Sequence, residues 1–241
     1  MNGIRHDGWH FDHCERGPFA AVAAPENAFG RKNMELSEYP TFTVIMRGYT
    51  PDQADAIMQA MAGFEDQFGV EVTMNTPHAL DIIENGNAQY GDKLKIGAGT
   101  VLTLDEAKDA IGKGAKFILS PIEFTDDIFA YAKAHKVITV PAAMSPTEVH
   151  TMFDKGADIV KIFPATTVGS GFFKAIQAPL GKLPLMAVGG VSLKNVKDLL
   201  THGTSYLGIG SNMFNQEDLI NRDVAGLAAS LQAFVDIKNT L

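Results

Sequence analysis

The chain has 241 residues, a formal net charge of -8, 46% hydrophobic residues and 20% charged residues. That composition excludes a disordered chain, and the length suffices for one large domain with its own hydrophobic core. The acidic balance, without a cluster of Lys or Arg, excludes a nucleic-acid-binding protein, and no apolar run is long enough to cross a membrane.

The first forty or so residues differ from the rest, because they hold three of the seven histidines, the only Trp and no clear periodicity. We expect an N-terminal extension over residues 1–38 and one compact domain over residues 39–241. His6 and His10 have the spacing of metal ligands on a helix, and His13 and Cys14 follow closely. Gly8 lies between the first two and no matching cluster appears later, so we expect no metal.

The cellular compartment is indicated by cysteine usage and by the first residues. Cys14 is the only cysteine, so an intrachain disulfide is impossible and a reducing compartment is expected. The polar segment that begins the sequence lacks the apolar stretch of a secretory signal. Both observations predict a cytoplasmic protein.

Eight short apolar runs, rich in Val and Ile, recur from residue 41 onward with stretches of helix length between them. Near-continuous hydrophobicity is typical of parallel strands that are covered on both faces. The expected strands are Thr41–Met46, Val70–Met74, Lys95–Ala98, Phe117–Leu119, Val137–Val140, Ile159–Phe163, Leu185–Val188 and Tyr206–Ile209.

The stretches between these strands carry the signals of helix ends. Capping boxes begin three of them, at Thr50–Gln53, Thr103–Glu106 and Ser145–Glu148. Glycines precede four strands, where helices should end or the chain turn back: Gly69, Gly114, Gly156 and Gly203. Repeated βα units fit either an open doubly wound sheet or a closed barrel, and eight is the number of the barrel. We therefore expect the α/β class, as a single-domain (β/α)₈ TIM barrel with an N-terminal extension.

The most informative residue is Lys161, which lies in the middle of the apolar run Ile159–Phe163. Both faces of a barrel strand are buried, and an unpaired Lys there is costly unless it is neutral. Burial lowers the pKa of an amine and leaves the lone pair that a Schiff-base nucleophile needs. The alternative is a structural Lys that reaches the rim or pairs with a carboxylate.

Glu71 is a second charged residue in a predicted strand, and it would share a face with Thr73 and Asn75. If that face lines the barrel interior, the Glu71 carboxyl and the Lys161 amine meet there. A buried carboxyl beside an imine is suited to proton transfer, whereas the alternative is a structural ion pair. Either arrangement would mark a candidate site.

The loops after several predicted strands offer ligand contacts. Glycine-rich turns follow the last two strands, at Val188–Ser192 and Gly208–Asn212. Such loops commonly bind phosphate through backbone N–H groups, and Ser211 could add a hydroxyl. Thr100, after the third strand, fits a ligand contact or a helix cap equally well. Arg47, after the first strand, offers a fork for a carboxylate or is only a surface residue.

These positions together resemble the family of 2-keto-3-deoxy-6-phosphogluconate (KDPG) aldolases and their 6-phosphogalactonate and 4-hydroxy-2-oxoglutarate relatives. The resemblance covers about residues 41–214 and depends on the order and spacing of the set, because no single motif is specific. The motifs are Ile45–Gly48, Gly69–Thr73, Ile96–Val101, Ser120–Pro121, Val160–Ala165, Val188–Val191 and Gly208–Ser211.

The resemblance implies a homotrimeric barrel that cleaves KDPG or its galactonate epimer to pyruvate and glyceraldehyde 3-phosphate. No cofactor would be needed, because the phosphorylated 2-keto acid binds covalently to a lysine. Lys161 would form the Schiff base and Glu71 would act as general acid and base. The other implied contacts are Arg47 and Thr100 for the carboxylate, Pro121 and Phe163 for the pocket, and Gly189, Gly190, Gly210 and Ser211 for the phosphate.

Two positions bear on the choice between the epimers. Asn75 and Val188 stand where gluconate-specific members often carry Arg and Thr. Together with the Arg47–Gly48 pair, they make the chain more similar to galactonate-type or mixed members. Two other functions compete with the aldolase. One is a different phosphate-binding barrel enzyme, either an isomerase or a transferase similar to thiamine-phosphate synthase. The other is a non-catalytic module that binds a phosphorylated metabolite.

Overall fold

A computed structural model describes residues 34–241 of the chain. Its strands are all parallel and follow the order β5-β4-β3-β2-β1-β9-β8-β7-β6 in one sheet. The strands are β1 (Phe42–Met46), β2 (Phe68–Thr73), β3 (Lys95–Gly99), β4 (Phe117–Leu119), β5 (Ile138–Val140), β6 (Ala142–Ala143), β7 (Val160–Ile162), β8 (Leu185–Val188) and β9 (Tyr206–Ile209).

The sheet closes on itself through β5 and β6, which are two halves of one barrel strand separated by Pro141. Proline has no N–H to donate, which interrupts the ladder at this point. The ladder between the divided strand and β7 is continuous, because carbonyls along β5 and β6 accept hydrogen bonds from alternate residues of β7 and its ends. The N–H groups of Ile159, Lys161 and Phe163 donate to Thr139, Pro141 and Ala143. The prediction of a (β/α)₈ TIM barrel is therefore confirmed, with its fifth strand divided in two.

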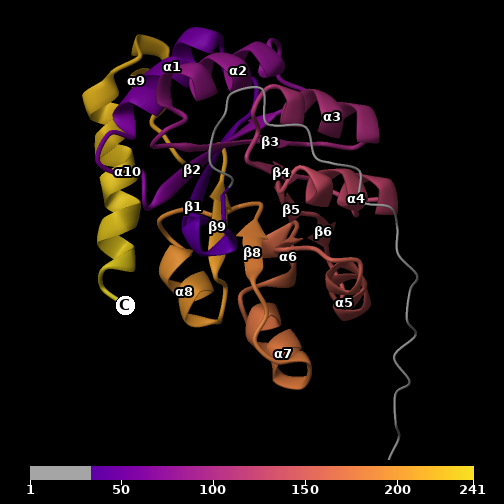
Figure 1. The fold of residues 1–241 in the computed structure, drawn as a ribbon. Coiled ribbons are helices and arrows are strands. Elements are labelled where there is room, and N and C mark those ends of the chain that lie inside the picture. The colour runs from indigo at the N-terminus through magenta and orange to yellow at the C-terminus, as the bar shows by residue number, and fades with distance from the viewer. Residues whose placement is uncertain (1–33) are drawn as a thin grey trace, which may run out of the picture.

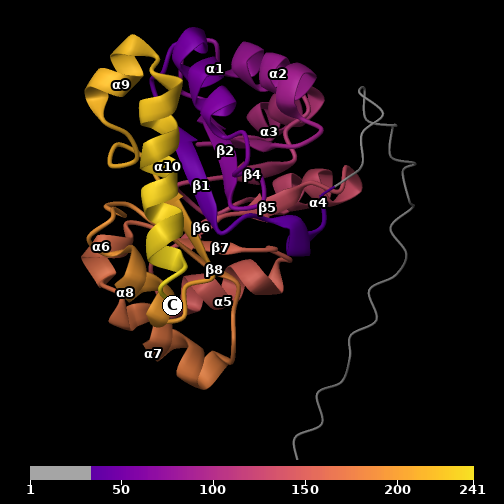
Figure 2. The ribbon, with the colours of Figure 1, turned by 90° about the vertical axis from the view of Figure 1, so that its left-hand side faces the viewer.

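Helices surround this sheet on its outer side, as Figures 1 and 2 show. Helix α10 lies outside the first strands and packs against α1 and α8, so the two ends of the barrel sequence meet. The helices are the 3₁₀ helix η1 (Leu36–Glu38), α1 (Pro51–Ala60), α2 (Ala79–Tyr90), α3 (Leu104–Gly112), α4 (Asp126–Ala134), α5 (Pro146–Asp154), α6 (Ala165–Val168), α7 (Gly171–Leu180), α8 (Val196–Thr201), α9 (Gln216–Asn221) and α10 (Val224–Lys238).

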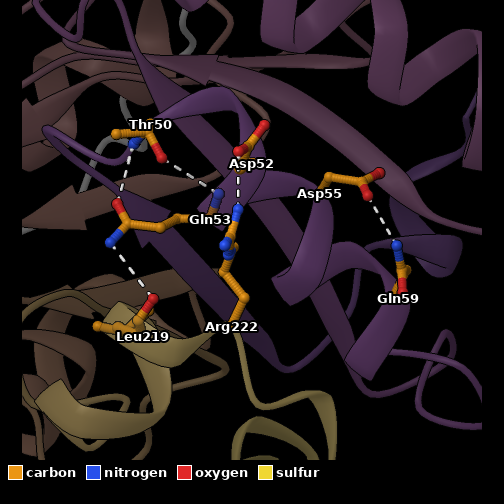
Figure 3. A network of polar contacts seen from close by, with 7 residues as sticks. All are labelled: Thr50, Asp52, Gln53, Asp55, Gln59, Leu219 and Arg222. Carbon is orange, nitrogen blue, oxygen red and sulfur yellow. Dashed lines mark hydrogen bonds and ion pairs between the residues drawn. The ribbon is translucent and has the colours of Figure 1, made fainter.

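The three predicted capping boxes are all present, at the starts of α1, α3 and α5. At α1 the Thr50 hydroxyl accepts from the Gln53 N–H, and the Gln53 side chain accepts from the Thr50 N–H (Figure 3). Gln53 also donates to the Leu219 carbonyl, and Arg222 pairs with Asp52 at 2.8 Å. These contacts connect the first helix of the barrel to α9.

The glycine prediction is correct at three positions and wrong at the fourth. Gly114, Gly156 and Gly203 have φ values of 93°, 100° and 91° and end helices in the left-handed region. Gly69 instead lies inside β2, which begins earlier than expected. A Cβ there would lie 2.9 Å from Pro40 Cγ, so Gly69 allows a close approach between chain segments rather than a turn.

The barrel interior is filled by a separate apolar cluster, which includes Ile159, Met186 and Val188. The segment before β1 closes one end of the barrel, because Tyr39 inserts its ring edge-on against both Phe117 and Tyr206. Met34 and Leu36 of the expected extension join the same cluster. The domain division near residue 39 stays a prediction, and the histidines and cysteine of the first residues lie outside the described part.

Candidate active site

Strand alternation brings Lys161 and Glu71 into the barrel interior. Lys161 lies on β7 between Ile159 and Phe163, and Ile159 belongs to the interior cluster. The exposed fraction of Lys161 is 4% and that of Glu71 is 1%, so both groups are removed from bulk water. A titratable pair this deep in the barrel is unusual and marks a candidate active site.

Burial dominates the electrostatics of both groups. It raises the pKa of Glu71, although the charges of Lys161 and Arg47 oppose the shift. Burial also lowers the pKa of Lys161; Glu71 opposes this shift and Arg47 adds to it. Among residues 34–241 no ion pair joins the two, and Glu71 Oε2 has no hydrogen-bond partner there. These directions favour an uncharged amine with an available lone pair, rather than a structural salt bridge.

Glu71 occupies space that a glycine leaves open. The sequence predicted a strand ending at Ala98, but β3 continues to Gly99. Gly97 and Gly99 therefore share the interior face, and a Cβ on Gly99 would overlap the Glu71 carboxyl. Sequence reasoning missed this role of Gly99. The available signal was the spacing of Gly97 and Gly99, which puts two residues without side chains on the same face at the end of a predicted strand.

The rim above this pair contains Thr100 and Arg47. Thr100 follows β3 with φ of 54°, a left-handed conformation that costs a β-branched residue about 1–3 kcal/mol. Strain of this kind gathers at sites where the surrounding structure holds a side chain in place. Arg47 follows β1 and is exposed, yet its charge acts on both Glu71 and Lys161.

The remaining predicted pocket residues lie at the same end of the strands. Phe163 follows β7 and is half-buried, with Lys161 Nζ 5.5 Å from its ring centroid. Pro121 follows β4 and is also half-buried. Of the two positions that bear on the epimer, Val188 is buried in the interior cluster and Asn75 is exposed after β2.

The residues predicted to bind phosphate lie in the loops after β8 and β9. Gly189 and Gly190 have φ values of 97° and 77°. Their neighbouring carbonyls are engaged, because Asn195 donates to Gly190 at 2.9 Å and Asn212 donates to the Val191 carbonyl. The second of these bonds connects the two loops. Gly210 and Ser211 follow β9; Gly210 is half-buried and Ser211 is exposed.

A buried amine and carboxyl at the carboxyl ends of TIM-barrel strands define an enzyme site, because barrel enzymes carry their chemistry at this face. The model of the KDPG and KHG aldolase family matches residues 36–229. The chain belongs to this family and is an aldolase, which makes it an aldehyde-lyase. The predictions of family and enzyme class are confirmed, and the isomerase, transferase and binding-module alternatives are set aside.

Individual relatives agree with this assignment. The chain is 32% identical to 2-dehydro-3-deoxy-6-phosphogalactonate aldolase of Escherichia coli strain K12, over 79% of this chain and 92% of that protein. It is 30% identical to 2-dehydro-3-deoxy-phosphogluconate aldolase of Treponema pallidum strain Nichols, over 70% and 80%. A solved structure described as native KDPGal superposes with a TM-score of 0.74 at 28% identity, over 86% of this chain and 100% of that one.

Proposed function

We propose that the chain is a class I aldolase that cleaves 2-keto-3-deoxy-6-phosphogalactonate, and to a smaller extent its gluconate epimer, into pyruvate and glyceraldehyde 3-phosphate. The observation that carries this proposal is the buried Lys161 amine, whose pKa is lowered by burial and which lies inside the barrel with Glu71. Relatives named for each of the two substrates support the substrate class.

The proposed reaction begins when the Lys161 amine attacks the C2 ketone of the substrate. Loss of water gives an iminium, which draws electrons from the C3–C4 bond. Glu71, through a water, removes the proton of the C4 hydroxyl, and the bond breaks to release the aldehyde. The enamine that remains takes up a proton at C3. Water then hydrolyses the iminium, which releases pyruvate and restores the free amine.

The substrate would be held at both ends. Arg47 and Thr100 bind the carboxylate, and Pro121 and Phe163 bound the pocket beside the reacting carbons. The phosphate lies on the N–H groups of the loops after β8 and β9, at Gly189, Gly190, Gly210 and Ser211. The positive φ values of Gly189 and Gly190 support this role, because glycine lets the backbone approach an oxyanion closely.

Borohydride trapping with pyruvate, followed by peptide mass spectrometry, tests the chemistry. We expect a reduced pyruvyl adduct on Lys161. An adduct on another lysine would retain the chemistry and reject the site. Folded protein that gives no adduct at saturating pyruvate would reject the mechanism.

The choice of epimer depends on Asn75 and Val188, which lack the Arg and Thr that gluconate-specific members often carry. Val188 faces the interior beside Gly208, where its Cγ2 would lie 2.8 Å from an added Cβ. We expect kcat/KM for the galactonate epimer to exceed that for the gluconate epimer by about tenfold, the effect of one lost polar contact. Purified epimers in a coupled glyceraldehyde 3-phosphate assay measure the ratio. Equal values would contradict this assignment.

A homotrimer is the proposed assembly, and an apolar strip along the rim supports it. Leu102, Ile122 and Met144 are 44%, 55% and 43% exposed and follow β3, β4 and β6. Exposed apolar side chains on adjacent loops favour a protein interface. We expect Ile122→Glu to dissociate the assembly in sedimentation velocity, whereas Ile220→Glu on α9 should leave it intact. A monomeric unsubstituted chain would overturn the proposal.

The proposed place of action is the cytoplasm. None of the helices between residues 34 and 241 is long and apolar enough to span a membrane. The single cysteine suits a reducing compartment, and a phosphorylated sugar acid is a charged metabolite that does not cross membranes unaided. Cell fractionation with antibodies against the chain would test this assignment.

A further inference from the structure

Two buried threonine hydroxyls hold the backbone on both sides of Arg47. The Gly48 N–H donates to Thr76 Oγ1 at 2.9 Å. The Met46 carbonyl lies 3.3 Å from Thr76 Oγ1 and 3.4 Å from Thr73 Oγ1. The two hydroxyls are themselves 2.8 Å apart. The residue between Met46 and Gly48 is therefore fixed from before and from after.

The hydrogen-bonding capacity of this group matches its contacts. Each hydroxyl has one proton, so one proton lies between the hydroxyls and the other points to the Met46 carbonyl. Thr76 Oγ1 also accepts the Gly48 N–H, which uses its free acceptor capacity. Gly48 adopts φ of 74°, so the chain turns sharply as it leaves β1. A hydroxyl is required here, because an apolar side chain would leave a backbone donor without a partner.

Thr73 is 0% and Thr76 is 4% exposed, and the contacts above already use both hydroxyl protons, so we do not assign these threonines as substrate contacts. Their level in the barrel matches that of Arg47. Met46, the last residue of β1, pairs in register with Val72, so Arg47 and Thr73 each follow directly after this pair. The Arg47 guanidinium makes no ion pair within the described chain. Its position therefore depends on its backbone rather than on a partner side chain.

We infer that Thr73 and Thr76 are positioning residues that aim the Arg47 guanidinium at the substrate carboxylate. The inference rests on the proposed function, in which Arg47 binds that group. The two hydroxyls would then contribute to substrate affinity without touching the reacting carbons. Loss of a hydroxyl should therefore weaken ground-state binding and leave the chemical step almost unchanged.

The test is Thr76→Val, which keeps the shape of the side chain and removes the hydroxyl. We expect KM for the keto acid, and the half-saturating pyruvate concentration in borohydride trapping, to rise about fivefold to tenfold. kcat should change by less than about twofold. Thr76→Ser restores the hydroxyl and should recover the original values. Trapping of hydroxyacetone, a ketone without a carboxylate, should be the same in all three proteins.

A matched control is Thr139→Val, which also removes a buried hydroxyl. Thr139 Oγ1 donates to Asp158 at 2.9 Å, away from Arg47. This variant should lose thermal stability and keep its KM. If Thr76→Val weakens hydroxyacetone trapping as much as pyruvate trapping, the defect is general and the inference is wrong.

Arg47→Ala separates the inference from the function on which it rests. If Arg47→Ala raises the half-saturating pyruvate concentration and Thr76→Val does not, the positioning role fails while the proposed function stands. If Arg47→Ala itself has no effect, carboxylate binding by Arg47 is rejected, and the positioning role is rejected with it. The inference stands only if Arg47→Ala and Thr76→Val both raise the half-saturating pyruvate concentration and Thr76→Ser does not.

Discussion

Lys161→Met is expected to abolish aldol cleavage and the trapped pyruvyl adduct together, because the side chain no longer offers an amine to the C2 ketone. Removal of a covalent nucleophile costs on the order of 10⁴-fold or more in turnover. The variant should still bind the phosphorylated substrate, because the rim and the loops after β8 and β9 are untouched. A coupled aldehyde assay, trapping and calorimetric titration measure the three properties.

Lys161→Met should also be more stable than the unsubstituted chain. The Lys161 side chain is buried, and burial lowers the pKa of its amine in the folded state. Below that folded-state pKa the protein holds a buried charge, and stability rises with pH as far as about 10.4, the value for an unfolded lysine. The advantage of Lys161→Met should therefore be largest at acidic pH and shrink as pH rises. Thermal unfolding at several pH values measures it.

The control for this prediction is Lys174→Met on α7, where the side chain is exposed. It should change neither the adduct nor the pH dependence of stability. Residual cleavage by Lys161→Met above about one part in a hundred, with the adduct moved to another lysine, would show that a different amine carries the reaction. A loss of folded protein would instead mean that Lys161 is structural.

The strands were predictable because burial on both faces gives near-continuous apolar runs, and the capping boxes because they are local. The division of the fifth strand was not predictable, since the effect of Pro141 on the hydrogen-bond ladder depends on which neighbouring strand its missing N–H would have faced. Gly69 was placed in a turn, and Gly99 beyond the end of its strand, for a related reason. In the sequence, a glycine that leaves space for a neighbouring segment cannot be distinguished from a glycine that allows the chain to turn.

In the site, alternation along a strand was enough to bring Lys161 and Glu71 to one interior. Nothing local indicates the contacts of Thr76, because its partners Met46 and Gly48 lie about thirty residues earlier in the chain. They come together only when β1 and β2 pair in register. Predicting contacts between segments far apart in the chain requires the tertiary structure, whereas predicting which face of a strand a residue lies on does not.

Gly99→Ala is expected to reduce cleavage almost as much as removal of Glu71 itself. The added Cβ would overlap the Glu71 carboxyl, and the buried site offers that carboxyl little room to move. Displacing a general acid and base costs about 10²–10⁴-fold in turnover. In the proposed mechanism the imine forms on Lys161, so pyruvate trapping should remain. Measuring kcat beside the trapping rate separates the two steps.

The double variant decides whether Gly99 acts through Glu71. Gly99→Ala combined with Glu71→Gln should be no slower than Glu71→Gln alone, because both changes remove the same proton transfer. Gly97→Ala is the matched control, since its added Cβ would overlap the ring and the backbone carbonyl of Phe117 rather than the Glu71 carboxyl. It should lower stability and keep turnover per folded molecule. If the two substitutions reduce turnover independently, so that their effects multiply in the double variant, Gly99 is needed for packing and does not act through the Glu71 carboxyl.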